Sequence, residues 1–276
     1  MKHLARTHLA LAFGLSFSAL AAMGPAMALG ASDDESERLA RWKEIQATIF
    51  GDRKLESTDA LVTIDAPVRA MDASLVPITL AMPEKDRIAG LHLVIDDNPS
   101  PYAAKFTFGP ASDPGEIKLR VRVNNYTNVH AVAETKDGRL LEAVKFVKAS
   151  GGCSAPMGMS DEEAMKGMGE MRMKFAGEAM SGKPVEATLM IRHPNFSGMQ
   201  MNQVTREYTP ARYINKVAVT RGDQTVLTLD GDISIASNPV INFALQPGGR
   251  GPIKVTASDN QNGRWEHSFT APSATN

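Results

Sequence analysis

A single cysteine, Cys153, is the only thiol among the 276 residues, and aromatic side chains make up only 6% of the chain. One cysteine cannot close a disulfide within the chain, which excludes a fold held together by disulfides. The 30 basic and 31 acidic residues nearly cancel. This balance gives no electrostatic case for binding nucleic acid or an anionic membrane.

The signatures of known catalysts are also missing. The sequence contains no G-x-S-x-G, Walker loop, H-E-x-x-H, C-x-x-C or dinucleotide-binding fingerprint. We therefore expect no turnover by this chain alone, no catalytic residues, no cofactor and no metal site built on those motifs.

Long apolar runs are confined to the N-terminus, where Leu9–Met23 follows a short basic start and precedes Ala26-Met27-Ala28. This is the layout of a secretory signal peptide, which we assign to residues 1–28, with cleavage after Ala28 or after Ala31. The run is short for a membrane span. Because no pair of arginines precedes it, we expect export by the general secretory route.

The mature sequence begins with a predicted helix and then changes to strands. Residues 33–49 carry apolar side chains at helical spacing. Apolar and polar residues then alternate, as in "EIKLRVRV", whose Lys118, Arg120 and Arg122 are expected to face away from the apolar side. About seven short strands result, as in an immunoglobulin-like sandwich. They cover Leu61–Asp65, Ser74–Met82, Ile88–Ile95, Tyr102–Gly109, Ile117–Val123, Asn128–Thr135 and Leu140–Val147.

A second set of strands predicts another all-β domain of about ninety residues. Its segments are Val185–His193, Tyr213–Thr220, Thr225–Gly231, Val240–Pro247, Ile253–Asp259 and Trp265–Thr270. The predicted fold is therefore all-β, with two immunoglobulin-like β-sandwich domains, a short helical linker and an N-terminal helix. We place the domains at residues 33–153 and 184–272, with the linker at 154–183.

The linker is rich in methionine. Ser160 and Glu163 form a capping box that predicts a helix from Asp161 to about Phe175. Thioethers at such spacings suit Cu(I), but they also form the apolar face of an ordinary helix, which we favour. The methionines in question are Met157, Met159, Met165, Met168, Met171, Met173 and Met180.

Cys153 follows Gly151 and Gly152 and precedes Ser154-Ala155-Pro156. A lone cysteine in an exported protein indicates a reactive thiol or pairing with another chain. The alternative is a buried, inert cysteine that acts as a small hydrophobic side chain. We favour an open thiol, because glycines without Cβ atoms let the backbone swing. No neighbouring charge clearly lowers its pKa, so we expect a partner to activate it.

Among the histidines, His193 at a strand end is the best placed for a functional role, although a turn histidine is the favoured interpretation. His92 and His267 lie in strand patterns, and we expect them to be solvated.

Longer segments carry a family resemblance. Residues 61–153, with "IDAPVRAMDASLVPITL", "LVIDDNPSPYAAKFTFGP" and a terminal "GGC", resemble SoxY, the carrier of bacterial sulfur oxidation. Residues 185–271, with "IRHPNFSGMQ", "ARYINKVAV", "DISIASNPVINFAL" and "GPIKVTASDN", resemble its partner SoxZ. The order of the two is similar to fused SoxYZ-like carriers associated with quinoprotein dehydrogenases.

The resemblance implies a periplasmic carrier of sulfur metabolism, of the kind used in thiosulfate oxidation, with paired SoxY and SoxZ domains. It makes Cys153 the covalent sulfur-carrier residue and Gly151 and Gly152 its flexible hinge. Implied partners are periplasmic oxidoreductases, either Sox-type enzymes or a PQQ-dependent dehydrogenase. SoxY ends in GGCGG, whereas here the chain continues through Pro156, so we expect an arm tethered at both ends with a shorter reach.

Two other functions stay open. The chain could be an accessory module that binds copper through Cys153 and the methionines. It could also be a structural adaptor for a periplasmic quinoprotein dehydrogenase, with Cys153 forming a disulfide between two copies.

Overall fold

The computed structural model describes residues 35–57, 61–176, 182–202 and 205–271. The predicted signal peptide lies outside these residues. No helix within them is long and apolar enough to cross a membrane.

The predicted strands are confirmed in order, and their ends agree within two residues except for the strand predicted at Ile117–Val123, which runs from Ser112 to Val121. The N-terminal helix α1 spans Glu35–Phe50, and short helices lie at Lys85–Arg87 (η1) and Asp161–Met165 (α2). The strands of the first half are β1 Leu55–Ser57, β2 Thr63–Asp65, β3 Val76–Ala81, β4 Ile88–Ile95, β5 Tyr102–Phe108, β6 Ser112–Val121, β7 Thr127–Thr135 and β8 Leu140–Val147. Those of the second half are β9 Met171–Ala176, β10 Val185–Ile191, β11 Ile214–Arg221, β12 Gln224–Gly231, β13 Val240–Leu245, β14 Ile253–Asp259 and β15 Arg264–Phe269.

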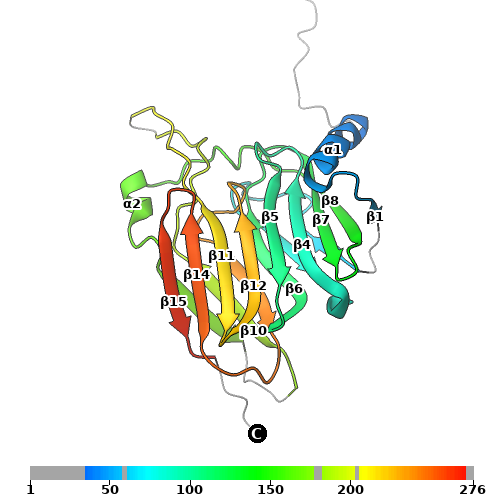
Figure 1. Cartoon of the computed structure of the whole chain (residues 1–276). Helices are drawn as coiled ribbons and strands as arrows, with labels where there is room; N and C mark the ends of the chain where they lie inside the picture. The colour runs from blue at the N-terminus through cyan, green and yellow to red at the C-terminus, as the bar shows by residue number, and fades with distance from the viewer. Residues whose placement is uncertain (1–34, 58–60, 177–181, 203–204, 272–276) are drawn as a thin grey trace, which may run out of the picture. The chain divides into compact units, whose positions relative to one another are not determined.

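The strands form two sheets (Figure 1). The larger has nine strands in the order β1-β8-β7-β4-β5-β12-β11-β14-β15, and the smaller has six in the order β2-β3-β6-β13-β10-β9. Neighbours pair antiparallel except β1, which runs parallel to β8. An all-β sandwich with an N-terminal helix is therefore confirmed.

Both sheets run without a break from one half of the chain into the other. Strand β5 pairs with β12, and β6 pairs with β13. The buried apolar side chains between the sheets also form one cluster that extends from Leu61 to Ala257. The two sandwiches thus share sheets and core, and pairing between the halves buries edge strands that would otherwise invite association.

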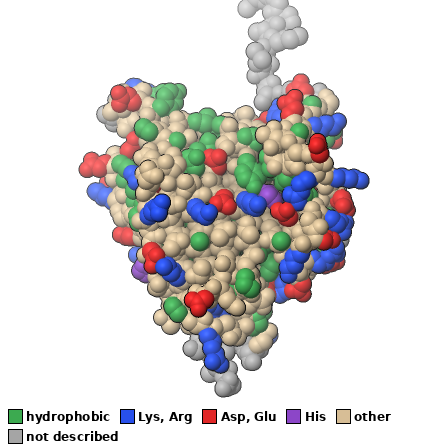
Figure 2. All heavy atoms as spheres, viewed as in Figure 1, with side chains coloured by type: hydrophobic (Ala, Val, Ile, Leu, Met, Phe, Trp, Pro, Cys, Tyr) green, Lys and Arg blue, Asp and Glu red, His purple; other side chains and the backbone are tan. Residues whose placement is uncertain are grey.

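The outer face of the nine-stranded sheet differs between its two halves. Figure 2 shows acidic and basic side chains mixed over this face. The alternating burial of β11 and β14 reflects strands with one face toward the core and one toward solvent. Strand β4 is buried on both faces, because α1 covers its outer side through a separate apolar cluster.

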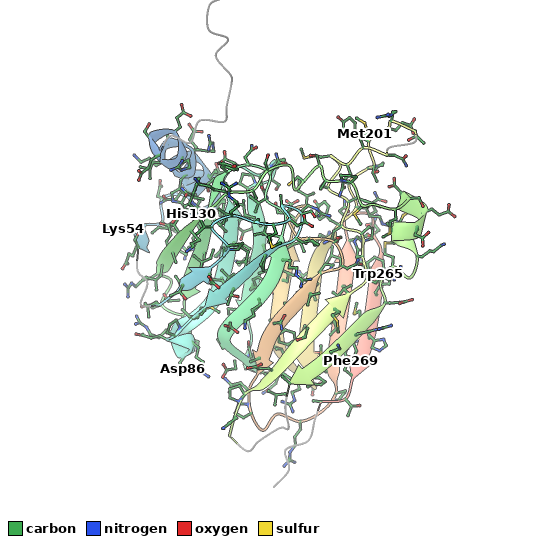
Figure 3. The ribbon with its side chains drawn as sticks, turned by 180° about the vertical axis from the view of Figure 1, so that it is seen from behind. Lys54, Asp86, His130, Met201, Trp265 and Phe269 are labelled. Atoms are coloured by element: carbon green, nitrogen blue, oxygen red, sulfur yellow. The ribbon has the colours of Figure 1, made fainter. Side chains whose placement is uncertain are left out.

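Trp42 anchors α1 on the sheet. Its ring stacks on the His130 imidazole with 3.7 Å between centroids, and His130 lies beside α1 in Figure 3. His130 is held between two buried carboxylates, with 2.7 Å from Nδ1 to Glu142 and 3.0 Å from Nε2 to Asp96. Burial alone would lower the pKa of His130, but hydrogen bonds and charge from these two carboxylates outweigh it and raise the pKa.

This cluster predicts a pH dependence of stability. A histidine whose pKa is raised on folding stabilises the native state fully below its unfolded value of about 6.5. That contribution is lost as the pH rises through the folded pKa. We expect the NMR titration of His130 to give a pKa above that of a free histidine, and Asp96→Asn to lower it. A wild-type value at or below about 6.5 would contradict the assignment.

The predicted linker helix is partly wrong. Ser160 caps α2 as expected, since its side chain accepts a hydrogen bond from the amide of Glu163. The helix ends at Met165, however, and Met171–Ala176 form β9, which pairs with β10. In "MRMKFA" the apolar residues also alternate with period two. Pairing with the edge of β10 therefore stabilises this segment as a strand instead of a helix.

Candidate functional site

Cys153 lies buried at the junction of the two halves, with 0% of its surface exposed. The expectation of an open, loosely held thiol does not describe this arrangement, in which the segment around Cys153 is docked against the body of the protein. We call residues 151–157 in this position the docked segment.

Backbone hydrogen bonds hold the N-terminal side of the docked segment to the first half. The amide of Gly151 donates to the Asn124 carbonyl at 2.8 Å, and that of Gly152 donates to the Val123 carbonyl at 3.0 Å. A Cβ atom on Gly152 would lie 2.0 Å from the Ala73 carbonyl oxygen. The missing side chain of Gly152 therefore permits close backbone approach, a second use of glycine besides flexibility.

The C-terminal side of the docked segment is tied to the second half. The Ser197 hydroxyl donates to the Cys153 carbonyl, and the Gln200 side chain reaches the Met157 thioether at 3.9 Å. Just beyond, the Thr209 hydroxyl donates to Asp161 at 2.8 Å. The thiol is thus held by both halves at once.

The charge of Arg122 lowers the pKa of Cys153, and the expectation that Arg122 faces solvent is wrong. Strand β6 ends at Val121, and Arg122 turns inward with only 1% of its surface exposed. Its guanidinium donates to the carbonyls of Ile235 at 2.7 Å and Ile233 at 3.2 Å. Asn98, which is also buried, fixes this turn by donating to the Arg122 carbonyl at 2.7 Å.

The docked thiol is protonated at neutral pH. Burial raises the pKa of Cys153 to about 11, and the charge of Arg122 opposes that shift. Burial likewise lowers the pKa of Arg122 to about 10, which leaves it charged at neutral pH. Since a thiolate is the reactive form, Cys153 is unreactive while docked.

The methionines do not gather into one group. Met171 and Met173 pack against the shared core from β9, in agreement with a packing role but on a strand instead of a helix. Met157, Met159 and Met201 line a pocket of about 630 Å³ beside the docked segment; Met201 is labelled in Figure 3. Met180 lies outside the described residues.

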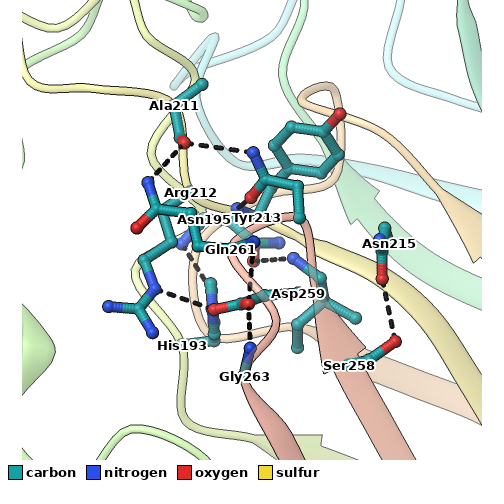
Figure 4. A network of polar contacts seen from close by, with 12 residues as sticks. His193, Asn195, Ala211, Arg212, Tyr213, Asn215, Ser258, Asp259, Gln261 and Gly263 are labelled. Carbon is teal, nitrogen blue, oxygen red and sulfur yellow. Dashed lines mark hydrogen bonds and ion pairs between the residues drawn. The ribbon is translucent and has the colours of Figure 1, made fainter.

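His193 has a structural role consistent with a turn histidine (Figure 4). Its Nδ1 accepts from the amide of Asn195 at 3.0 Å, and its Nε2 lies 3.5 Å from Asp259. Asp259 also accepts from Arg212 Nε at 2.7 Å. Burial is the main reason that the pKa of His193 is lowered.

The other two histidines differ from each other. His267 is exposed as predicted. His92 is buried and lies 2.6 Å from the Tyr102 hydroxyl, so its predicted solvation is wrong. Within the described part of the chain, no group of three or more His, Cys, Asp or Glu side chains is placed to hold a metal ion.

Three residues of the site escaped prediction from sequence: Arg122, Asn98 and Ser197. Arg122 continues a strand pattern whose other basic residues do face solvent, and Asn98 lies in a proline-rich loop. The segments "LVIDDNPSPYAAKFTFGP" and "IRHPNFSGMQ", which contain Asn98 and Ser197, carried a signal because they are part of the family resemblance, whereas Arg122 lies outside the quoted segments.

Comparison with known proteins assigns the two halves of the chain to two protein families. Residues 46–153 match the family "Sulfur oxidation protein SoxY", and residues 172–270 match "Sulphur oxidation protein SoxZ". The chain belongs to these families as a fused SoxYZ-like protein. The SoxY match ends at Cys153, and the SoxZ match begins within β9, a strand that we had predicted as linker.

Two solved structures show partial likeness. The sulfur carrier protein SoxY from Chlorobium limicola f. thiosulfatophilum is 27% identical, with a TM-score of 0.36, over 41% of this chain and 96% of that one. A Corynebacterium diphtheriae protein described as membrane anchored is 10% identical, with a TM-score of 0.25, over 81% of this chain and 61% of that one. No curated protein matches the chain.

Proposed function

We propose that this protein is a periplasmic, non-catalytic carrier that holds sulfur-containing intermediates covalently on Cys153 for partner oxidoreductases. The observation that carries the proposal is the position of the only cysteine, at the last residue of the SoxY match and at the junction with the SoxZ half. A SoxY protein to which part of this chain is similar is described as a sulfur carrier.

The proposed cycle needs two positions of the segment that bears the thiol. In the docked position Cys153 is buried and protonated, so it neither attacks nor releases a group. Release of the hydrogen bonds from Gly151, Gly152 and Ser197 would expose the thiol to a partner. Residues 151 and 152 then act as the hinge, and the thiolate forms as the thiol returns to water.

The partner enzymes belong to the same proposal. We propose periplasmic oxidoreductases, either Sox-type enzymes or a PQQ-dependent dehydrogenase, because nothing in the described residues supplies redox chemistry beyond the thiol itself. Export by the signal peptide at residues 1–28 would bring the chain to the compartment of these enzymes.

Intact-mass spectrometry of the exported protein tests the carrier role. We expect adducts of sulfane sulfur, sulfonate or thiosulfonate on the wild-type protein and none on Cys153→Ser, because no other thiol is available. The variant should also stop the partner pathway. Full pathway activity in Cys153→Ser would overturn the proposal, and a mass shift of one copper ion on the native wild-type protein would favour the copper-binding alternative.

A further inference from the structure

Arg122 is a buried cation that has no anionic partner among the residues that the structure describes. Its Nη atoms meet only main-chain carbonyl oxygens, those of Ile233, Ile235 and, at 3.5 Å, Pro194. Its Nε is buried and has no hydrogen-bond partner among the described residues. An arginine buried in this way is costly unless an anion compensates it. Arg212, in contrast, has the Asp259 carboxylate as its ion-pair partner.

Backbone hydrogen bonds of the docked segment bring Cys153 close to this arginine. Gly151 bonds to Asn124 and Gly152 to Val123, the two residues that follow Arg122, and the chain turns at residues 151–154. Cys153 and Arg122 are close enough for each to act on the charge of the other. Both residues then meet the same segment of the second half, Arg122 at the Pro194 carbonyl and Cys153 through the Ser197 hydroxyl. The thiol and the guanidinium thus lie buried near one another at the junction of the two halves.

We propose that Arg122 is the counter-ion of an anionic group carried on Cys153, and that it makes docking selective for anionic over neutral adducts. The inference rests on the carrier role proposed above and assigns a positioning residue to it. A guanidinium with a free N–H suits a terminal sulfane anion or a sulfur oxoanion, since charge-assisted hydrogen bonds are the stronger kind. An empty carrier leaves Arg122 unpaired, so the loaded segment docks more firmly than the empty one.

Two adducts of nearly equal size and different charge provide the test. Exposed Cys153 thiolate displaces iodide from iodoacetate to give S-carboxymethylcysteine, which is anionic, or from iodoacetamide to give S-carbamidomethylcysteine, which is neutral. In each reaction a carbon–sulfur bond forms, iodide leaves and the thiol proton passes to buffer. The mature full-length chain is labelled under conditions that open the docked segment, returned to native buffer at neutral pH and melted.

For the wild-type protein we expect the carboxymethyl adduct to melt about 3 °C higher than the carbamidomethyl adduct, or more. Arg122→Gln should remove or reverse this difference, and Arg122→Lys should keep a large part of it because the charge remains. Arg221→Gln is the matched control. Arg221 is also buried, its Nε also lacks a partner, and its Nη1 contacts the Gln246 carbonyl away from Cys153. This control should keep the full difference.

Equal melting temperatures of the two wild-type adducts would overturn the proposal, even if the Arg122→Gln variant does not fold. A loss of the difference in Arg221→Gln as large as in Arg122→Gln would also overturn it. The test uses synthetic groups and no partner enzyme, so its result is separate from that of the carrier test. An exported protein without sulfur adducts but with the expected melting difference would refute the carrier role and retain the anion-selective site.

Discussion

Alanine at position 152 is expected to speed the alkylation of Cys153 by iodoacetamide about 100-fold or more in the folded protein. The added Cβ would lie 2.0 Å from the Ala73 carbonyl oxygen and 2.6 Å from that of Val123. Neither carbonyl can retreat freely, because the Val123 amide already bonds to Ala73 and Gly152 bonds to Val123. Overpacking of this kind costs about 3 kcal/mol, and each 1.4 kcal/mol shifts the opening equilibrium tenfold.

The neighbouring Gly151→Ala variant is the control for this prediction. Its Cβ would meet only the Ser154 hydroxyl at 3.9 Å, so its cost comes from the backbone φ of +76° alone. That strain is about 1 kcal/mol, which gives an increase of only about fivefold. Near-UV circular dichroism should show that both variants keep the packed core. Alkylation of folded Gly152→Ala at the wild-type rate would contradict the docked position of the thiol.

Truncation of Trp42 to alanine should lower the free energy of unfolding by about 3–5 kcal/mol. Trp42 is 7% exposed and fills the space between α1 and the outer face of the sheet, where it contacts the His130 ring and the cluster of Val94, Val132 and Leu140. Its loss leaves a cavity and exposes the histidine to water. Urea unfolding at a fixed pH measures the change.

Leu39→Ala on the same helix is the matched control, because Leu39 is 51% exposed and belongs to neither apolar cluster. We expect its effect to stay within about 0.5 kcal/mol, as for most surface substitutions. If Trp42→Ala changed stability no more than Leu39→Ala does, α1 would not be anchored through Trp42. A large loss would show that the N-terminal helix is an integral part of the fold.

The two largest effects concern different parts of the molecule, and this separates stability from presentation of the thiol. Trp42 acts on the packing of α1, through an apolar cluster that is separate from the shared core. Gly152 acts on the docked segment, where its Cβ would press on the backbone carbonyls of Ala73 and Val123. A carrier requires this separation, because its thiol must leave the body without unfolding it.

Local patterns in the sequence were sufficient for most of the secondary structure. Alternation with period two located thirteen of the fifteen strands in the described part of the chain, and helical spacing located α1. The exceptions are informative. Strand β1 is too short to show an alternating pattern. Strand β9 lies in a stretch whose methionines fit both the helical and the strand period, so whether it formed a helix or a strand depended on pairing with the edge of β10.

The sequence by itself also determined the class of protein, through two family-like segments in one chain with a lone cysteine between them. Only the tertiary structure decided how that cysteine is held. Gly-Gly has the same sequence signature whether it serves as a hinge or admits a neighbouring backbone, and the neighbour here is Ala73, distant along the chain. The tertiary structure also decides the position of the Arg122 side chain. The strand pattern predicts that it faces solvent, but the carbonyls that accept its hydrogen bonds belong to the second half. Contacts between residues remote in sequence set both outcomes, and a local pattern does not contain them.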